Sequence, residues 1–254
     1  MVDDDSLGLF VAARTCTAAA SDRRAWDGGE VKPYYEHNGI VIYHGDCREI
    51  LPTLKADCVV TDPPYGVNLG SHKSASETRP GFLVKGAYAS YDDSQANLES
   101  VVVPSVVAAL GMAKRGAVFC APTKVCYFPE PSAVGGVYLP AGCGRTCWGF
   151  QNLALVMFYG IAPELQKGAK ATMIRSTESA EANAHPCPKP FGWMRWLVNL
   201  ASLHGETIID PFMGSGTTLV AAKLEGRKAI GIEIEEKYCE IAVKRLAQDV
   251  LQFP

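Results

Sequence analysis

The sequence predicts a doubly wound α/β fold, in which helices cover both faces of a mainly parallel sheet. Short apolar and β-branched segments alternate along the chain with segments whose apolar residues recur at helical spacing. Several strand-like segments end in an acidic residue, and one is followed by a glycine-rich turn and a helix. The length of 254 residues fits one large domain, which we place at residues 32–254.

The first predicted elements form a parallel strand–helix–strand unit. Residues 39–44 (GIVIYH) and 57–61 (DCVVT) are predicted strands, and residues 47–54 between them carry apolar residues at helical spacing. The short joints are typical of a βαβ unit. Residues 1–31 show no steady period, so we expect a flexible N-terminal extension there.

The middle of the chain is less regular. Residues 66–95 are rich in Gly, Ser and Lys and predict a long loop, a feature that is usually functional or disordered. Ser94 can cap a helix that runs to Lys114, with Pro104 as a kink or break. A buried strand is predicted at residues 117–121.

The rest of the chain continues the alternation of strands and helices. Residues 122–185 are predicted to be a variable region, in which 137–139 and 153–159 are candidate strands of a hairpin. The elements predicted after it are helix 191–203, strand 207–209, helix 215–224, strand 228–232 and helix 238–251.

The composition is that of an ordinary globular protein, with 48% hydrophobic and 20% charged residues. No apolar run reaches the roughly 18 residues that cross a bilayer, and no secretory signal is recognisable, so we expect a cytoplasmic protein without a membrane partner. The net charge of -3 is unusual for a protein that binds nucleic acid, although the middle of the chain is richer in cations.

Nine cysteines are scattered along the chain, which argues against a disulfide framework. Cys120, Cys126, Cys143 and Cys147 could in principle hold zinc, but their spacings are not the tight two-residue kind, and we expect no metal.

A glycine turn carries the first functional signal. It joins the predicted strand 207–209 to the following helix, and its candidate ligand-binding residues are Asp210, Phe212, Gly214, Ser215, Gly216, Thr217 and Thr218. Glycines let the backbone approach a ligand closely, and Glu233 at the end of the next strand can accept hydrogen bonds from ribose hydroxyls. The pattern predicts a nucleoside cofactor, although an ordinary capped turn would also explain it.

A second motif, Asp62-Pro63-Pro64-Tyr65, follows the strand at residues 57–61. The prolines have no N–H to donate, so the segment presents a carboxylate, backbone carbonyls and an aromatic ring at the edge where ligands bind. Such a flat, acceptor-rich site suits a planar group that bears an –NH2. A rigid turn with packing roles for Asp62 and Tyr65 is the alternative.

Together, the two motifs resemble those of the amino-methylating DNA methyltransferases. In that family the Asp-Pro-Pro-Tyr segment is catalytic, and the Asp-Pro-Phe-x-Gly-Ser-Gly-Thr-Thr segment binds S-adenosylmethionine. Here the catalytic segment comes first, which resembles the beta group and implies a circularly permuted, Rossmann-like sheet. The resemblance covers roughly residues 32–245.

The resemblance implies further site residues. Asp46 corresponds to an acidic residue that reaches the cofactor adenine, Lys189 to a residue near the methionine part of the cofactor, and Glu233 to the ribose position. It also implies a substrate base turned out of the DNA helix, a possible homodimer, and a possible restriction partner. Cations in the long loop (Lys73, Arg79 and Lys85) are candidate phosphate contacts, or else belong to a solvated loop.

Several functional alternatives remain open at this point. Asp at the first position of the catalytic motif favours N6-adenine over N4-cytosine methylation. A nicotinamide-dependent oxidoreductase would explain the glycine turn and Glu233, but not residues 62–65 or Lys189. A non-enzymatic nucleoside-binding module would give no reason for the acceptors at residues 62–65.

Overall fold

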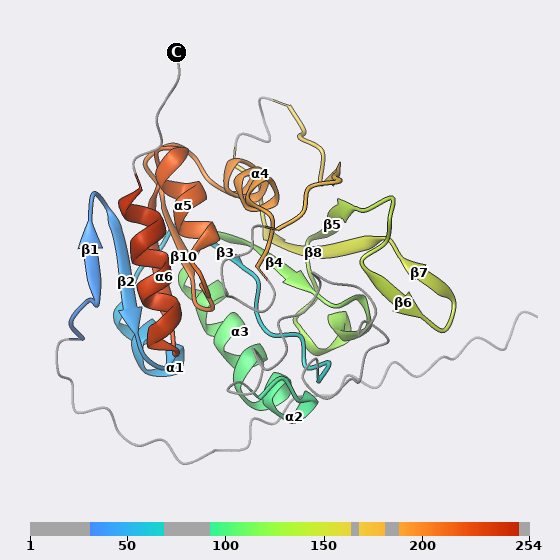
Figure 1. The fold of residues 1–254 in the computed structure, drawn as a ribbon, viewed down its shortest axis with the longest axis horizontal. Helices are drawn as coiled ribbons and strands as arrows, with labels where there is room; N and C mark the ends of the chain where they lie inside the picture. Colours follow the sequence, from blue (N-terminus) through green and yellow to red (C-terminus); the bar gives the residue numbers. More distant parts are fainter. Residues whose placement is uncertain (1–30, 69–91, 164–167, 181–187, 249–254) are drawn as a thin grey trace, which may run out of the picture. The chain divides into compact units, whose positions relative to one another are not determined.

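The computed structural model describes residues 31–68, 92–163, 168–180 and 188–248. The predicted N-terminal extension and the loop cations Lys73, Arg79 and Lys85 therefore lie outside the described residues. The described residues form a nine-stranded sheet with helices on both faces, together with a separate two-stranded hairpin (Figure 1).

The centre of the sheet consists of five parallel strands, as the sequence predicts. In spatial order they are β2 (Ile40–His44), β11 (Lys228–Glu233), β10 (Thr207–Asp210), β3 (Cys58–Thr61) and β4 (Arg115–Cys120). The last two strands of the chain thus lie between strands from its first quarter. This arrangement is the circularly permuted sheet implied by the order of the motifs.

Shorter or antiparallel strands complete both sides of the sheet. β1 (Tyr35–His37) pairs antiparallel with β2 at one side. At the other side β8 (Leu153–Gly160) runs antiparallel to β4 and to β5 (Ala133–Tyr138), and β9 (Met173–Arg175) pairs parallel with β5. The predicted hairpin between residues 137 and 159 is confirmed, whereas β1 and β9 were not expected.

Apolar helices cover the two faces of this sheet. One face packs against α4 (Phe191–Ala201), α5 (Thr217–Leu224) and α6 (Glu236–Ala247). The opposite face packs against α1 (Cys47–Ile50), the 3-10 turn η1 (Leu51–Thr53) and α3 (Val103–Met112). Since helices cover both faces of the sheet, the central strands β3, β4 and β10 are almost wholly buried, which explains their continuous apolar runs.

The helix predicted from Ser94 to Lys114 is interrupted. Ser94 caps α2 (Gln95–Asn97), which continues through a π-helical turn, η3 (Leu98–Val102), into α3. Pro104 lies at the start of α3, where it lacks the N–H needed for the regular helical ladder, and the wider turn precedes it. By length and composition alone the stretch Gln95–Met112 could span a membrane, but Leu98, Val102 and Val106 are buried within the protein.

The remaining boundaries differ by a few residues from the predicted ones. The helix predicted from residue 215 begins at Thr217, because Ser215 and Gly216 belong to the preceding turn. The last helix begins at Glu236 and ends at Ala247. The region predicted as variable also contains η4 (Pro122–Tyr127) and a small hairpin, β6 (Gly144–Thr146) and β7 (Gly149–Gln151).

Gly231 allows β11 to lie close to the glycine turn. A Cβ atom at this position would lie 2.8 Å from Leu219 Cδ2 and closer still to Met213 Sδ.

We expect Gly231→Ala to lower the free energy of unfolding by about 1–3 kcal/mol in urea titrations, since overpacking displaces the turn. Gly111→Ala in α3, where an added Cβ meets nothing within 4 Å, is the control and should be neutral or slightly stabilising. Equal stability of both variants and the wild type would contradict this packing constraint.

Candidate active site

A cavity of about 280 Å³ lies at the carboxyl edge of the parallel strands. Segments that follow β2, β3, β10 and β11 contribute to its walls, as expected for an open α/β sheet. Among the predicted site residues, those that line it are Asp46, Asp62, Pro63, Pro64, Tyr65, Lys189, Asp210, Phe212, Gly214, Ser215, Thr217, Thr218 and Glu233. The structure therefore brings together two motifs that lie about 150 positions apart in the chain.

The glycine turn is held by backbone contacts to the neighbouring strand. Gly214 adopts a φ of 51°, and its N–H donates to Glu233 Oε2 at 3.0 Å. Gly216 has a φ of 79°, but it does not line the cavity, and a Cβ there would lie 2.7 Å from that of Ala242. Gly216 lets the turn pack closely against α6, and its contact with the cofactor stays a prediction.

A buried carboxylate fastens this turn to the end of β3. Asp210 accepts hydrogen bonds from Thr61 Oγ1 at 2.7 Å, Thr218 Oγ1 at 2.5 Å and the Phe212 N–H at 3.1 Å. Burial raises the pKa of the Asp210 carboxyl to about 6, against these hydrogen bonds, which favour the ionised form. The hydrogen bond between Thr218 and Asp210 thus occupies both side chains and holds the turn in position.

Arg245 of α6 donates hydrogen bonds to the turn, a role that was not anticipated from the sequence. Its Nη1 donates to the Ser215 carbonyl at 2.8 Å and to Thr217 Oγ1 at 3.0 Å. An arginine in a terminal amphipathic helix carries no local signal of this role. The side chains of Ser215 and Thr217 are therefore engaged in the fold as well as exposed to the cavity.

Glu233 occupies the end of β11, beside the turn. Its Oε1 accepts from the Glu235 N–H at 2.9 Å, and its Oε2 accepts from Gly214. Burial raises the pKa of the Glu233 carboxyl to about 7, although these backbone N–H groups favour its ionised form. Each carboxylate oxygen can accept a second hydrogen bond, so Glu233 retains capacity for two ligand hydroxyls.

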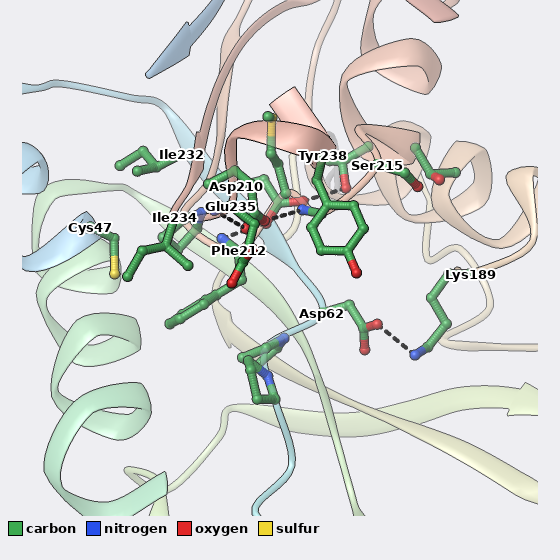
Figure 2. Close-up of a pocket in the computed structure, with 18 of the residues that line it drawn as sticks. Cys47, Asp62, Lys189, Asp210, Phe212, Ser215, Ile232, Ile234, Glu235 and Tyr238 are labelled. Carbon is green, nitrogen blue, oxygen red and sulfur yellow. Dashed lines mark hydrogen bonds and ion pairs between the residues drawn. The ribbon is translucent and has the colours of Figure 1, made fainter. Parts of the chain in front are cut away.

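An apolar slot adjoins Glu233, and part of it was missed by sequence reasoning. Ile232, Ile234, Phe212 and Cys47 lie toward one end of the cavity in Figure 2. Ile234 is 52% exposed, which is unusual for an isoleucine that lines a cavity and indicates a surface that a flat ligand group could cover. The available signal was the apolar residue directly after the acidic strand end.

Asp46 lines the same region but is already engaged. It caps α1 through the Arg48 N–H at 2.9 Å and forms a two-point ion pair with the Arg48 guanidinium. The Arg48 side chain lowers the pKa of the Asp46 carboxyl despite partial burial. Asp46 is therefore the N-cap of α1, and any contact with a cofactor would use its remaining lone pairs.

The carboxylate of Asp62 is held from both sides. Tyr65 donates its hydroxyl to Asp62 Oδ1 at 2.6 Å, and Lys189 Nζ lies 2.5 Å from Oδ2. The Lys189 ammonium also lies 5.2 Å from the Tyr65 ring centroid and 5.4 Å from that of Phe119. Figure 2 shows the Asp62–Lys189 pair at the end of the cavity opposite Ile232 and Cys47.

Lys189 lines the cavity and forms an ion pair with Asp62. Sequence resemblance places Lys189 near the methionine part of the cofactor, and that contact stays a prediction. The side chains of Lys189 and Asp62 are largely buried, at 11% and 22% exposure, so water weakens this ion pair less than one at the surface.

Asp93 fixes the backbone after the catalytic segment. Its Oδ1 accepts from the Gly66 N–H at 2.7 Å, and its carbonyl accepts from Asn68 N–H at 2.8 Å. Gly66 has a φ of 66°, and a Cβ there would lie 2.7 Å from that of Leu98. This buried aspartate could not be recognised from the sequence, because it lies 27 positions after its partner.

The two ends of the cavity offer different chemistry. One end has an apolar slot next to a carboxylate able to accept hydroxyl groups, which fits the adenosine part of S-adenosylmethionine. The other end has a carboxylate and an aromatic ring, which fits a flat ring with an amine. No cluster of three or more metal-ligating side chains occurs in the described parts of the chain.

Comparisons with known proteins point to methyltransferases. A family model described as DNA methylase matches residues 148–244. The type II methyltransferase M.ScaI of Streptomyces caespitosus is 27% identical over an alignment that covers 85% of this chain and 84% of that protein. The type II methyltransferase M2.DpnII of Streptococcus pneumoniae is also 27% identical, with 85% and 92% covered.

The fold is shared with a solved structure, the cytosine-N4-specific PvuII DNA methyltransferase. The TM-score is 0.59 with 16% identity, and the superposition covers 87% of this chain and 91% of that one. This likeness confirms the Rossmann-like methyltransferase fold. The nicotinamide-dependent alternative finds no support in these similarities.

The raised pKa of Glu233 predicts a pH-dependent affinity for S-adenosylmethionine. Ribose hydroxyls donate to the ionised carboxylate, so below about pH 7 binding must release a proton from Glu233. We expect the affinity measured by calorimetry to rise with pH up to about 7 and then to level off. Glu233→Gln should bind S-adenosylmethionine more weakly, and its affinity should not rise with pH up to about 7. Parallel profiles for the two proteins would remove Glu233 from the cofactor site.

Proposed function

We propose that this chain, which belongs to the amino-methylating DNA methyltransferases and uses S-adenosylmethionine, methylates the N6 amine of adenine in DNA. The observation that carries the proposal is the position of Asp62. Its carboxylate stands at the end of the cavity opposite the apolar slot and beside the ring of Tyr65. An amine that is hydrogen-bonded to Asp62 would lie between the ring of Tyr65 and the proposed cofactor site.

The chemistry requires an amine to become a better nucleophile. The lone pair of an adenine N6 amine is shared with the ring, so the site must let it turn out of the ring plane. Asp62 would accept one N–H of the amine and the Pro63 carbonyl the other, which stabilises the positive charge that grows on nitrogen. Because a carboxylate offers about four acceptor positions, Asp62 can take this bond while it keeps Tyr65 and Lys189.

Tyr65 and Lys189 would hold the acceptor in place. The Tyr65 hydroxyl fixes one carboxylate oxygen, while its ring is available to stack on the base. Lys189 fixes the other oxygen from the α4 side. Two fixed oxygens reduce the motion of the acceptor and hold the amine in line for transfer.

The proposed cofactor contacts follow from the walls of the cavity. When bound, S-adenosylmethionine supplies a methyl group on a positively charged sulfonium. Glu233 would bind the ribose hydroxyls, and Ile234 and Phe212 would enclose the adenine ring. Asp210 would act indirectly, because its hydrogen bonds to Thr61 and Thr218 keep the glycine turn beside Asp62.

The substrate base must leave the duplex to reach this cavity. A base within a double helix cannot place its amine against Asp62, so the mechanism implies base flipping. The proposed phosphate contacts Lys73, Arg79 and Lys85 belong to the segment outside the described residues, and they stay predictions. A homodimer likewise stays a prediction.

Cytosine N4 methylation is the second candidate. It uses the same acceptor geometry, and the PvuII enzyme shares the fold. The preference for adenine rests on Asp at the first position of the catalytic motif, which resembles adenine enzymes more often than cytosine ones.

Analysis of the modified base tests the proposed substrate. We expect incubation of the full chain with tritiated S-adenosylmethionine and unmethylated DNA to label N6-methyladenine, detected after digestion to nucleosides by chromatography and mass spectrometry. Label in N4-methylcytosine would replace adenine by cytosine as the substrate. Absence of label in DNA, with the cofactor bound, would reject both.

Asp62→Ala tests the catalytic group directly. Loss of one preorganised partner of the developing charge should lower kcat by about 100-fold or more, while the cofactor affinity measured by calorimetry stays within about threefold. The matched control is Asp57→Ala, which removes a carboxylate at the opposite end of β3, where it pairs with Lys114. This control should retain kcat per folded molecule. Near wild-type transfer by Asp62→Ala would refute the assigned role.

A further inference from the structure

The hairpin formed by β6 and β7 extends the long antiparallel pair of β5 and β8. Leu139 N–H donates to the Asn152 carbonyl at 2.7 Å, and Cys143 N–H donates to the Gln151 carbonyl at 2.7 Å. These bonds carry the pairing beyond Tyr138 and Leu153, where the main sheet ends. Figure 1 shows the hairpin projecting away from the body of the sheet.

The register of the strands shows at which edge of the sheet the hairpin leaves. Cys120, the last residue of β4, pairs with Leu155 near the start of β8, whereas Arg115 at the start of β4 pairs with Gly160. The hairpin precedes β8, so it projects from the edge at which β4 ends. Because β3 and β4 are parallel, this is also the edge at which Asp62 follows β3.

The hairpin carries aromatic side chains into solvent. Trp148 at its tip is 96% exposed, and Phe150 on β7 is 66% exposed. The tip itself is ordered by Thr146, whose Oγ1 accepts from the Trp148 N–H at 3.1 Å and lies 3.2 Å from the Gly149 carbonyl. An exposed indole on a hydrogen-bonded tip presents a large flat surface with no apolar cover among the described residues.

The charge of the segment favours a polyanionic partner. Residues 139–153 include one arginine and contain no aspartate or glutamate, in a chain of net charge -3. The flat π-face of an indole suits the face of a nucleobase, and stacking of this kind tolerates any base sequence. A duplex with one base turned out exposes such a face at the vacated position.

We propose that Trp148 is a DNA-contacting residue that stacks on a base next to the one turned out into the cavity. This inference rests on the proposed function, because it assigns the substrate duplex to the edge of the sheet that holds Asp62. The hairpin would thereby limit return of the substrate base to the helix. Its contribution lies in binding DNA, and not in binding the cofactor.

Three variants of the full chain test the proposal. Trp148→Ala should weaken binding of an unmethylated DNA, measured in the presence of S-adenosylhomocysteine, by about 5- to 100-fold, the range implied by base–aromatic stacking. Trp148→Phe, which keeps a flat ring, should recover binding to within about threefold of the wild type. Ile161→Ala is the matched control, because Ile161 is 72% exposed just after the opposite end of β8 and should leave binding unchanged.

A fluorescence measurement distinguishes stacking of Trp148 on a base from a loss of affinity that is caused only by the smaller side chain. Stacking on bases quenches indole fluorescence, so DNA should quench the wild type more than Trp148→Phe, although both retain the other three tryptophans. Calorimetry should give the same cofactor affinity for the wild type and all three variants. Unchanged DNA binding by Trp148→Ala, or equal quenching in the wild type and Trp148→Phe, would overturn the proposal.

Two further outcomes are distinguishable. Sedimentation that shows a wild-type dimer and a Trp148→Ala monomer, with equal DNA affinity per chain, would assign the hairpin to contact between copies and reject the DNA role. A wild type that binds DNA without methylating it would reject the proposed function. In that case, weaker binding by Trp148→Ala would still support the stacking contact.

Discussion

Two buried hydrogen bonds to one carboxylate bring the parts of this site together. Thr61 at the end of β3 and Thr218 in α5 both donate to Asp210, which ends β10. The segment after β3 contains Asp62, and the segment after β10 contains the glycine turn. Because the three groups are buried and hydrogen-bonded to each other, the interior of the protein sets the separation between the segment after β3 and the glycine turn.

Burial of carboxylates at this edge of the sheet has an electrostatic consequence. Asp210 and Glu233 both have raised pKa values, about 6 and 7, because burial disfavours their charged forms. Hydroxyl donors within the fold offset the cost of burying the charge of Asp210. The carboxylate of Glu233 instead accepts from backbone N–H groups and faces the cavity. A ligand that brings hydroxyl donors and positive charge would relieve this cost, which links the chemistry of the cofactor to the stability of the site.

The carboxyl edge of the sheet collects every group that the proposed reaction needs. β11 and β10 contribute the proposed cofactor side, β3 contributes the acceptor for the amine, and α4 follows the lysine that fixes this acceptor. Strand β8 runs in the opposite direction, so the hairpin that precedes it reaches the same edge. One reversal of strand direction thus places an aromatic tip on the side where the substrate base would enter.

The sequence by itself determined the central strands, the main helices and the two motifs, because these depend on residues close together in the chain, whereas the short strands β1 and β9 were not expected from it. The parallel strands, the glycine turn and the Asp62–Tyr65 segment were all recognisable from local periodicity and spacing. Only the tertiary structure decided that Lys189 pairs with Asp62, that Gly216 packs on α6, and that Asp93 fixes the backbone at Gly66. The contact of Asp93 with Gly66 joins residues 27 positions apart, and that of Lys189 with Asp62 joins residues 127 positions apart. Such partners are chosen by strand order, register and the packing of helices, which no local pattern specifies.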